Sequence, residues 1–314
     1  MNSEMFLKLQ APNGADPIFN DRARVLFLGL GGHGRRTISE IKAQYQQFDQ
    51  APSRVRFMAV DSASYSFLEG CYLPVPVDTF SLYYPDRDLF YVDNHGEKSP
   101  AAKFDYGAGG DQAIGRQTLC GQGNKYGPLR DTLRALLREL AEDLQPGERV
   151  RVAIVSSLGG GTGAGIALDV CYLVRLLLQA LVPEEQSEVF GVFYSAEACL
   201  TIPPIGGDPY ISERIQENSE KTLEVLSRFM ASESSSPDAQ PRYELSLPNE
   251  EHILTYLPVL EPGHAFLISG SDPEQDFGEI IKQTVSGLMR LLYAGEGGSE
   301  GSHFLLRANF TPAE

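Results

Sequence analysis

Short, continuous runs of apolar residues recur along the chain and predict the buried strands of a parallel sheet. The first run ends at glycines and the second at an aspartate. The runs are residues 24–30, 55–60, 150–155, 189–194 and 265–269.

Between these runs, apolar residues return at the spacing of an α-helix. The clearest case is residues 128–144, where leucines repeat every three or four positions after a proline, and a Pro-Gly pair follows. Further helices are expected at residues 34–48, 163–181, 212–230 and 277–293. Because strands alternate with helices, the sequence predicts an α/β protein with a doubly wound, mostly parallel sheet.

Other segments lack this periodicity. We expect one main domain at residues 22–293, interrupted by a long surface excursion and a flexible loop. Residues 294–314 are interpreted as a glycine linker and the start of a truncated or absent second domain. The non-periodic segments are a disordered tail at 1–21, the excursion at 71–106, the loop at 232–241 and the linker at 294–301.

The charge and the cysteines of the chain argue against several classes of protein, among them nucleic-acid-binding proteins and proteins with cysteine metal sites. Asp and Glu outnumber Lys and Arg by 42 to 26, and the net charge of -16 would repel nucleic acid and anionic membranes. A phosphate ligand would then be held by backbone amides and a metal ion. The four cysteines lack metal-ligand spacing, and we find no signal peptide and no apolar run long enough to span a bilayer. We therefore expect a soluble, cytoplasmic protein with free thiols.

The strongest functional signal is Gly-Gly-Gly-Thr-Gly-Ala-Gly at residues 159–165, between a predicted strand and a long predicted helix. Successive glycines let the backbone approach a ligand with its amides turned inward, and the helix N-terminus adds its positive end. A simple connector would not need so many glycines, because each weakens local order. We predict a phosphate-binding loop formed by Gly159, Gly160, Gly161, Thr162 and Gly163.

A second glycine loop at residues 29–34 supports an alternative hypothesis. Gly29, Gly31 and Gly34 satisfy the dinucleotide fingerprint G-x-G-x-x-G, and Asp61 ends the next predicted strand. An NAD-dependent oxidoreductase of Rossmann type therefore competes with other interpretations. His33 is interpreted as a solvated turn residue and not as a catalytic base.

A third glycine loop lies at residues 106–115 and alone would be taken for a turn. A Walker loop ends in Gly-Lys followed by Ser or Thr, and the sequence has none. A Rossmann domain would use one glycine loop for its pyrophosphate and leave the others unexplained. Three loops suit a ligand with several phosphates held from several sides.

In this order, the loops resemble those of the tubulin/FtsZ superfamily of filament-forming guanine-nucleotide proteins. Residues 159–165 resemble the tubulin signature, and residues 28–34 are similar to the first phosphate loop of the FtsZ branch. Residues 60–63 (Val-Asp-Ser-Ala) resemble the metal-side loop, and residues 107–115 the loop that senses the third phosphate. The resemblance covers roughly residues 24–293, but only the loops match closely.

The resemblance implies a tubulin/FtsZ-type domain that binds GTP or GDP with Mg²⁺ and self-associates head to tail. Asp61 would support the magnesium ion. Glu197, Asn218 and Asp272 would contact the ribose or the base, although Asn218 could also be a surface helix residue and Asp272 a helix-capping turn. Besides the main loop, the phosphate side would comprise Gly31, Gly32, His33, Gly107, Ala108, Gly109 and Gly110.

Departures from the family pattern bear on hydrolysis more than on binding. Arg35 and Arg36 follow the first loop, where small or amide residues are usual. In the family, a neighbouring subunit supplies a carboxylate from the pattern N-x-D-x-x-D/E. The last six residues here keep Asn309 and Glu314 but have Thr311 in place of the first Asp. With Asn309 and Glu314 as the catalytic candidates, we expect weak or assembly-dependent GTP hydrolysis. A regulatory module that holds nucleotide without hydrolysing it is the non-enzymatic alternative.

Overall fold

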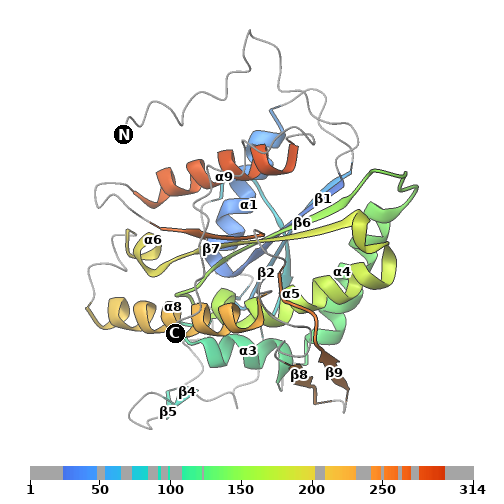
Figure 1. Ribbon diagram of the computed structural model, residues 1–314. Coiled ribbons are helices and arrows are strands. Elements are labelled where there is room, and N and C mark those ends of the chain that lie inside the picture. The colour runs from blue at the N-terminus through green and yellow to red at the C-terminus, as the bar shows by residue number, and fades with distance from the viewer. Residues whose placement is uncertain are drawn as a thin grey trace.

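The computed structural model describes residues 24–47, 54–64, 73–83, 91–92, 98–99, 108–121, 124–201, 209–230, 242–248, 251–260, 264–269 and 276–293. At its centre is a six-stranded sheet in which all neighbouring strands pair in parallel (Figure 1). The predicted fold class is confirmed. The spatial order of the strands is β10 (Ala265–Ile268), β7 (Ser187–Tyr194), β6 (Val150–Ser157), β1 (Arg24–Leu30), β2 (Val55–Asp61) and β3 (Asp78–Ser81).

Helices cover both faces of this sheet (Figure 1). One face is covered by α1 (Gly31–Tyr45) and α9 (Phe277–Tyr293), and the other by α4 (Tyr126–Ala141) and α5 (Thr162–Leu181). The helices α3 (Gln112–Cys120) and α8 (Pro209–Phe229) pack against α5.

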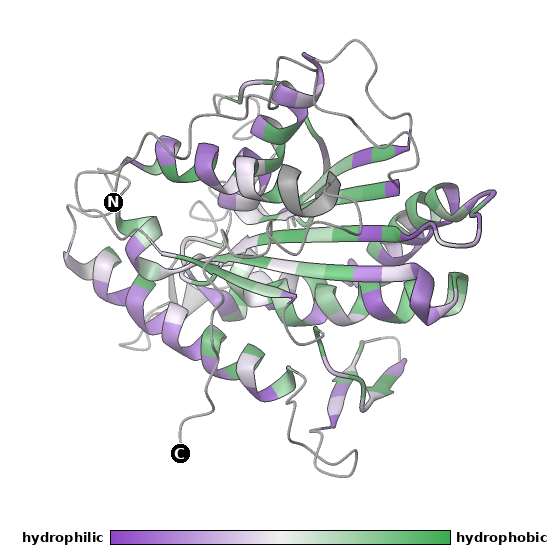
Figure 2. Ribbon diagram, turned by 45° about the horizontal axis from the view of Figure 1, so that its top comes forward, coloured by the Kyte–Doolittle hydropathy of each residue, from purple (hydrophilic) through white to green (hydrophobic). Residues whose placement is uncertain are grey.

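Successive side chains of a strand point to opposite faces, and this alternation divides the core into two clusters. In β1, Val25 and Phe27 pack beneath α1 and α9, whereas Leu26, Leu28 and Leu30 pack beneath α4 and α5. All five are fully buried. Figure 2 shows mainly apolar colour along the central strands. The sequences of the central strands are therefore continuous apolar runs, because helices cover both faces of the sheet.

The strand order places a topological switch between β1 and β6. From β1 the chain builds outward to β2 and β3, and from β6 it builds in the other direction to β7 and β10. Ligands of doubly wound proteins bind at the carboxyl ends of the strands beside such a switch. Since β1 leads into the first glycine loop and β6 into the main one, the topology brings these loops side by side.

The predicted strands and helices are confirmed, with small shifts at their ends. The shift that matters most for the site is in α1. This helix begins at Gly31 and not at residue 34, so the loop glycines form its first turn.

Several short elements were missed by the sequence analysis. The segment at residues 71–106 contains the edge strand β3, so its interpretation as an excursion without sheet structure was wrong. Its sequence, Asp-Thr-Phe-Ser, is short and polar because an edge strand packs less apolar surface than a central one. The other missed elements are the pair β4 (Tyr91–Val92) and β5 (Lys98–Ser99), helix α3, the 3₁₀ helix at Glu184–Gln186, α6 (Ala196–Leu200), and the hairpin of β8 (Tyr243–Ser246) and β9 (His252–Thr255).

Helix α5 is apolar on nearly all sides. By length and hydropathy alone it could cross a membrane, so the expectation that no run reaches that length was wrong. In the fold it is a core helix, since 61% of its most apolar window is buried inside the protein. Cys171 on this helix, like Cys120 and Cys199, is buried and free, as expected.

Candidate functional site

The three glycine loops meet at the carboxyl ends of the parallel strands. A Cβ atom on Gly31 would lie 2.8 Å from the backbone nitrogen of Gly163, so the first and main loops touch. A Cβ atom on Gly161 would lie 2.8 Å from the Ala108 side chain and 2.9 Å from the nitrogen of Gly110, so the third loop touches the main loop as well. Glycine is required at these contacts because the backbones approach too closely for a side chain.

Each loop also presents a glycine that faces open space. A Cβ atom on Gly32 or Gly109 would meet nothing within 4 Å, and one on Gly160 would meet only Ser157, at 3.5 Å from its Oγ. Gly109 and Gly110 have positive φ angles of 55° and 81°, a conformation that glycine adopts without strain. The loops therefore offer exposed backbone to a ligand from three sides.

Two helices direct uncapped N-termini into this region. Neither α1 nor α5 has a side-chain hydrogen bond at its N-cap or an acidic residue in its first turn. In contrast, Asp111 caps α3 by accepting a hydrogen bond from the Ile114 nitrogen at 3.1 Å. Free amides and the positive ends of two helix dipoles make an anion-binding site that needs no basic side chain. This suits a protein with a net charge of -16.

Asn218 on α8 ties the main and third loops together. Its Nδ2 donates hydrogen bonds to the carbonyl oxygens of Gly110 at 2.6 Å and Gly159 at 3.2 Å. The nearby Gln112 donates to the Asn218 carbonyl at 2.8 Å. Asn218 is buried, so its interpretation as a surface residue is wrong, and its role as a base contact stays a prediction.

One charged contact of the third loop was missed by sequence reasoning. Arg214 lies 2.9 Å from the carboxylate of Asp111, directly after Gly110. Its position four residues before Asn218 on the same helix could have indicated it, since residues at that spacing share a face.

At the end of β2, Asp61 lies beside the first loop but is paired within the protein. Its Oδ2 atom is 3.8 Å from the Nε atom of Arg35, and both side chains are buried. Burial raises the pKa of Asp61, while the charge of Arg35 and the backbone N–H groups of Ala63 and Ser62 act in the opposite direction. The neighbouring Ser62 hydroxyl is 2.5 Å from that of Thr162, which links β2 to the main loop.

These residues do not fit a magnesium ion bound directly by Asp61. Magnesium is held through one or two carboxylates together with waters and phosphates. Here the Asp61 carboxylate is buried and already has a cationic partner. Within the described residues, His, Cys, Asp and Glu form no group of three or more that could hold a metal ion.

His33 is not the solvated turn residue that the sequence suggested. Its Nε2 atom is buried and has no hydrogen-bond partner among the described residues. Its ring packs edge-on against Phe277 of α9, with ring centroids 4.9 Å apart, a contact that only the packing of α9 on α1 creates. Burial, helped by the positive charge of Arg36, lowers the pKa of His33 to about 4.

The lowered pKa makes stability depend on pH. Below pH 6.5 the unfolded chain takes up a proton on His33 that the folded protein resists, so the free energy of unfolding falls as the pH falls towards 4. Between pH 7 and pH 5 we expect this residue to remove about 2 kcal/mol. Urea unfolding at both pH values should show a smaller loss in His33→Gln. The exposed His252→Gln serves as the control and should keep the full loss; equal losses in all three proteins would contradict the assignment.

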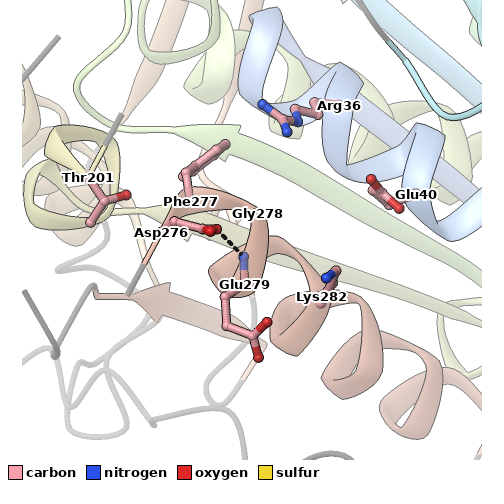
Figure 3. Close-up of a pocket in the computed structure, with 8 residues that line it drawn as sticks. All are labelled: Arg36, Glu40, Thr201, Asp276, Phe277, Gly278, Glu279 and Lys282. Carbon is pink, nitrogen blue, oxygen red and sulfur yellow. Dashed lines mark hydrogen bonds between the residues drawn. The ribbon is translucent and has the colours of Figure 1, made fainter. Parts of the chain in front are cut away.

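A cavity of about 420 Å³ lies next to the first loop, between α1, the end of α6 and the start of α9 (Figure 3). The guanidinium carbon of Arg36 is 5.9 Å from the centre of the Phe277 ring, which gives the cavity a cationic and an aromatic wall. Sequence reasoning missed this cavity because its walls come from distant segments. Its lining residues are Arg36, Glu40, Thr201, Asp276, Phe277, Gly278, Glu279 and Lys282.

Glu197 lies at the same edge of the sheet, in the first turn of α6, and accepts a hydrogen bond from the Ser195 hydroxyl at 2.5 Å. Its role as a ribose contact stays a prediction. Gly107, Asp272, Asn309 and Glu314 lie outside the described residues. The assignments of the base contact and of the catalytic step to these positions therefore stay predictions.

When the chain is compared with known proteins, the model of one protein family matches it. The family model described as "Tubulin like" matches residues 93–281, more than half of the chain. No curated protein matches.

Solved structures with a similar fold include CetZ2 from Haloferax volcanii in a GTPγS-bound protofilament, with 16% identity and a TM-score of 0.47 over 87% of this chain. A CetZ from Methanosaeta thermophila has 15% identity and a TM-score of 0.48 over 90% of the chain. TubZ from Bacillus thuringiensis serovar israelensis, in a GTPγS-form protofilament, has 15% identity and a TM-score of 0.49 over 87%. The chain spans 59%, 57% and 58% of these three proteins.

Proposed function

The chain belongs to the tubulin-like family, and on this premise we propose that it binds a guanine nucleotide, GTP or GDP, at the three glycine loops. The observation that carries the proposal is the convergence of the loops around the uncapped N-termini of α1 and α5. Backbone amides from Gly32, Gly109 and Gly160 would bind the phosphates from three sides. The cavity beside Phe277 would receive the base or the ribose, since the exposed guanidinium of Arg36 on its wall can interact with a purine ring.

The dinucleotide alternative has less support at its diagnostic residue. In that interpretation, Asp61 would accept hydrogen bonds from a ribose. Asp61 is only 4% exposed and lies against Arg35, so its carboxylate is not presented to a ligand. The other two glycine loops would also have no role.

Nucleotide-dependent head-to-tail self-association extends the proposal, as the family resemblance implies. Weak hydrolysis completed between subunits and a cytoplasmic location belong to the same proposal. A magnesium ion would reach the site on the phosphates of the nucleotide. The chain's own residues would bind and orient those phosphates with their amides.

The bound ligand tests the proposal directly. Heat-denatured protein should release guanine nucleotide, identified by chromatography. Calorimetry should show GTP binding at least about 100-fold more tightly than NAD, a difference of about 3 kcal/mol. Release of NAD, or tighter binding of NAD than of GTP, would replace this function by the dinucleotide alternative.

A further inference from the structure

Arg35 and Asp61 form a buried ion pair at the place where the family resemblance expects a metal ion. The pair joins the first turn of α1 to the last residue of β2. The Arg35 Nε atom is 3.8 Å from Asp61 Oδ2, and the two side chains are 5% and 6% exposed. A buried carboxylate is stable only with a compensating charge or hydrogen bonds, and here the arginine supplies the charge.

The other contacts of Asp61 also make its carboxylate a poor ligand for a metal ion. Its Oδ1 atom is 3.3 Å from the Ala63 nitrogen, which donates to it. Position 63 is an alanine, and the described residues contain no cluster of three or more acidic or metal-binding side chains. A hydrated divalent ion needs an accessible carboxylate with unbalanced charge. Arg35 balances the negative charge of Asp61, and burial prevents a hydrated ion from reaching its carboxylate.

The phosphates do not need this carboxylate. The first turns of α1 and α5 carry unbonded amides and no acidic side chain, and the open glycines Gly32 and Gly160 expose further backbone. Each helix N-terminus acts as a partial positive charge of about half a unit. Neutral donors therefore provide the binding that a metal bridge would otherwise supply.

We infer that Arg35 is the fixed counter-ion of Asp61, at the place where the family resemblance expects a magnesium ion held by the protein. Guanine nucleotide then binds whether or not its phosphates carry a divalent cation. The inference rests on the proposed nucleotide site. It concerns the electrostatics of that site and not the identity of the ligand.

Calorimetry with GTP and GDP, in buffer with Mg²⁺ and in buffer with EDTA, tests the inference on the wild-type protein. The dissociation constant for each nucleotide should differ by less than about threefold between the buffers. A loss of affinity of more than about tenfold for GTP in EDTA would overturn it.

Two variants separate the counter-ion role from a metal-ligand role. Asp61→Asn removes the negative charge, so GTP should bind more tightly, and equally so in both buffers. If Asp61 held magnesium, the same change would weaken binding only in the presence of Mg²⁺. Arg35→Gln leaves Asp61 uncompensated, so GTP affinity should fall by at least about tenfold, and to the same extent in both buffers, because burial keeps Mg²⁺ from Asp61. Arg138→Gln, which removes an exposed arginine from α4, should behave as the wild type.

The outcomes also distinguish this inference from the proposed function. If the wild-type protein binds neither GTP nor GDP in either buffer, the nucleotide site itself is wrong. If it binds them only with Mg²⁺, the proposed nucleotide site is supported, but the counter-ion role of Arg35 is contradicted. Thermal unfolding of each variant checks its folding, and the wild-type and Asp61→Asn measurements decide the matter if Arg35→Gln does not fold.

Discussion

Replacing Gly160 by valine should lower the affinity for GTP by at least about 100-fold, about 3 kcal/mol, while the protein stays folded. The added side chain has room within the protein, because its Cβ atom would meet only Ser157 Oγ, at 3.5 Å. Gly160 has no positive φ angle, so valine brings no backbone strain of that kind. Its branched side chain would instead fill the space where we place the phosphates.

The choice of Gly160 makes this experiment specific for the ligand. At Gly161, a Cβ atom would lie within 2.9 Å of the third loop, so substitution there would displace protein backbone and confuse folding with binding. Gly127, in the first turn of α4, provides the matched control. It also has open space around it, and Gly127→Val should keep the wild-type affinity.

Calorimetric titration with GTP, with circular dichroism to confirm folding, gives the measurement. Unchanged GTP affinity in folded Gly160→Val would show that the main loop does not hold the phosphates.

Replacing Arg116 by methionine should lower the free energy of unfolding by about 2 kcal/mol. Asp169 on α5 is 1% exposed and receives both guanidinium bonds of Arg116, at 2.8 and 3.0 Å. The hydroxyl of Tyr243 also donates to Asp169, at 2.6 Å. Without the arginine, the buried carboxylate of Asp169 loses its counter-charge and is left with neutral donors.

The Arg116 interaction holds three separate segments together. Arg116 lies on α3, directly after the third glycine loop, Asp169 lies on α5, directly after the main loop, and Tyr243 begins the β8–β9 hairpin. Thermal unfolding should show a decrease in Tm of about 5 °C.

The surface pair of Arg134 and Asp131, at 3.3 Å, is the control. Its arginine is exposed to a similar degree as Arg116, at 41% against 49%, but its aspartate is 65% exposed, whereas Asp169 is 1% exposed. Arg134→Met should change stability by less than about 1 kcal/mol. The double variant Arg116→Met with Asp169→Leu should recover much of the loss, because it removes the uncompensated charge. Equal stability of Arg116→Met and Arg134→Met would contradict the importance of the pair that Arg116 forms with the buried Asp169.

The amino-acid sequence by itself determined the central sheet, the helices that cover it and the three glycine loops. These features are local: a strand buried on both faces must be apolar throughout, and a helix on a sheet must repeat apolar residues at its own period. The same local rule explains the missed elements. The edge strand β3 is short and polar, and α3 begins inside a glycine-rich segment, so neither carries a strong pattern.

Only the tertiary structure decided which polar side chains belong together. The sequence alone does not distinguish Arg35 from a surface residue. The packing of α1 over β2 places it against Asp61. Asn218 connects two loops by hydrogen bonds, and His33 is a half-buried ring beside Phe277. Such contacts join residues far apart in sequence. They depend on the strand order and on how the helices lie on the sheet, and no local periodicity encodes either of these.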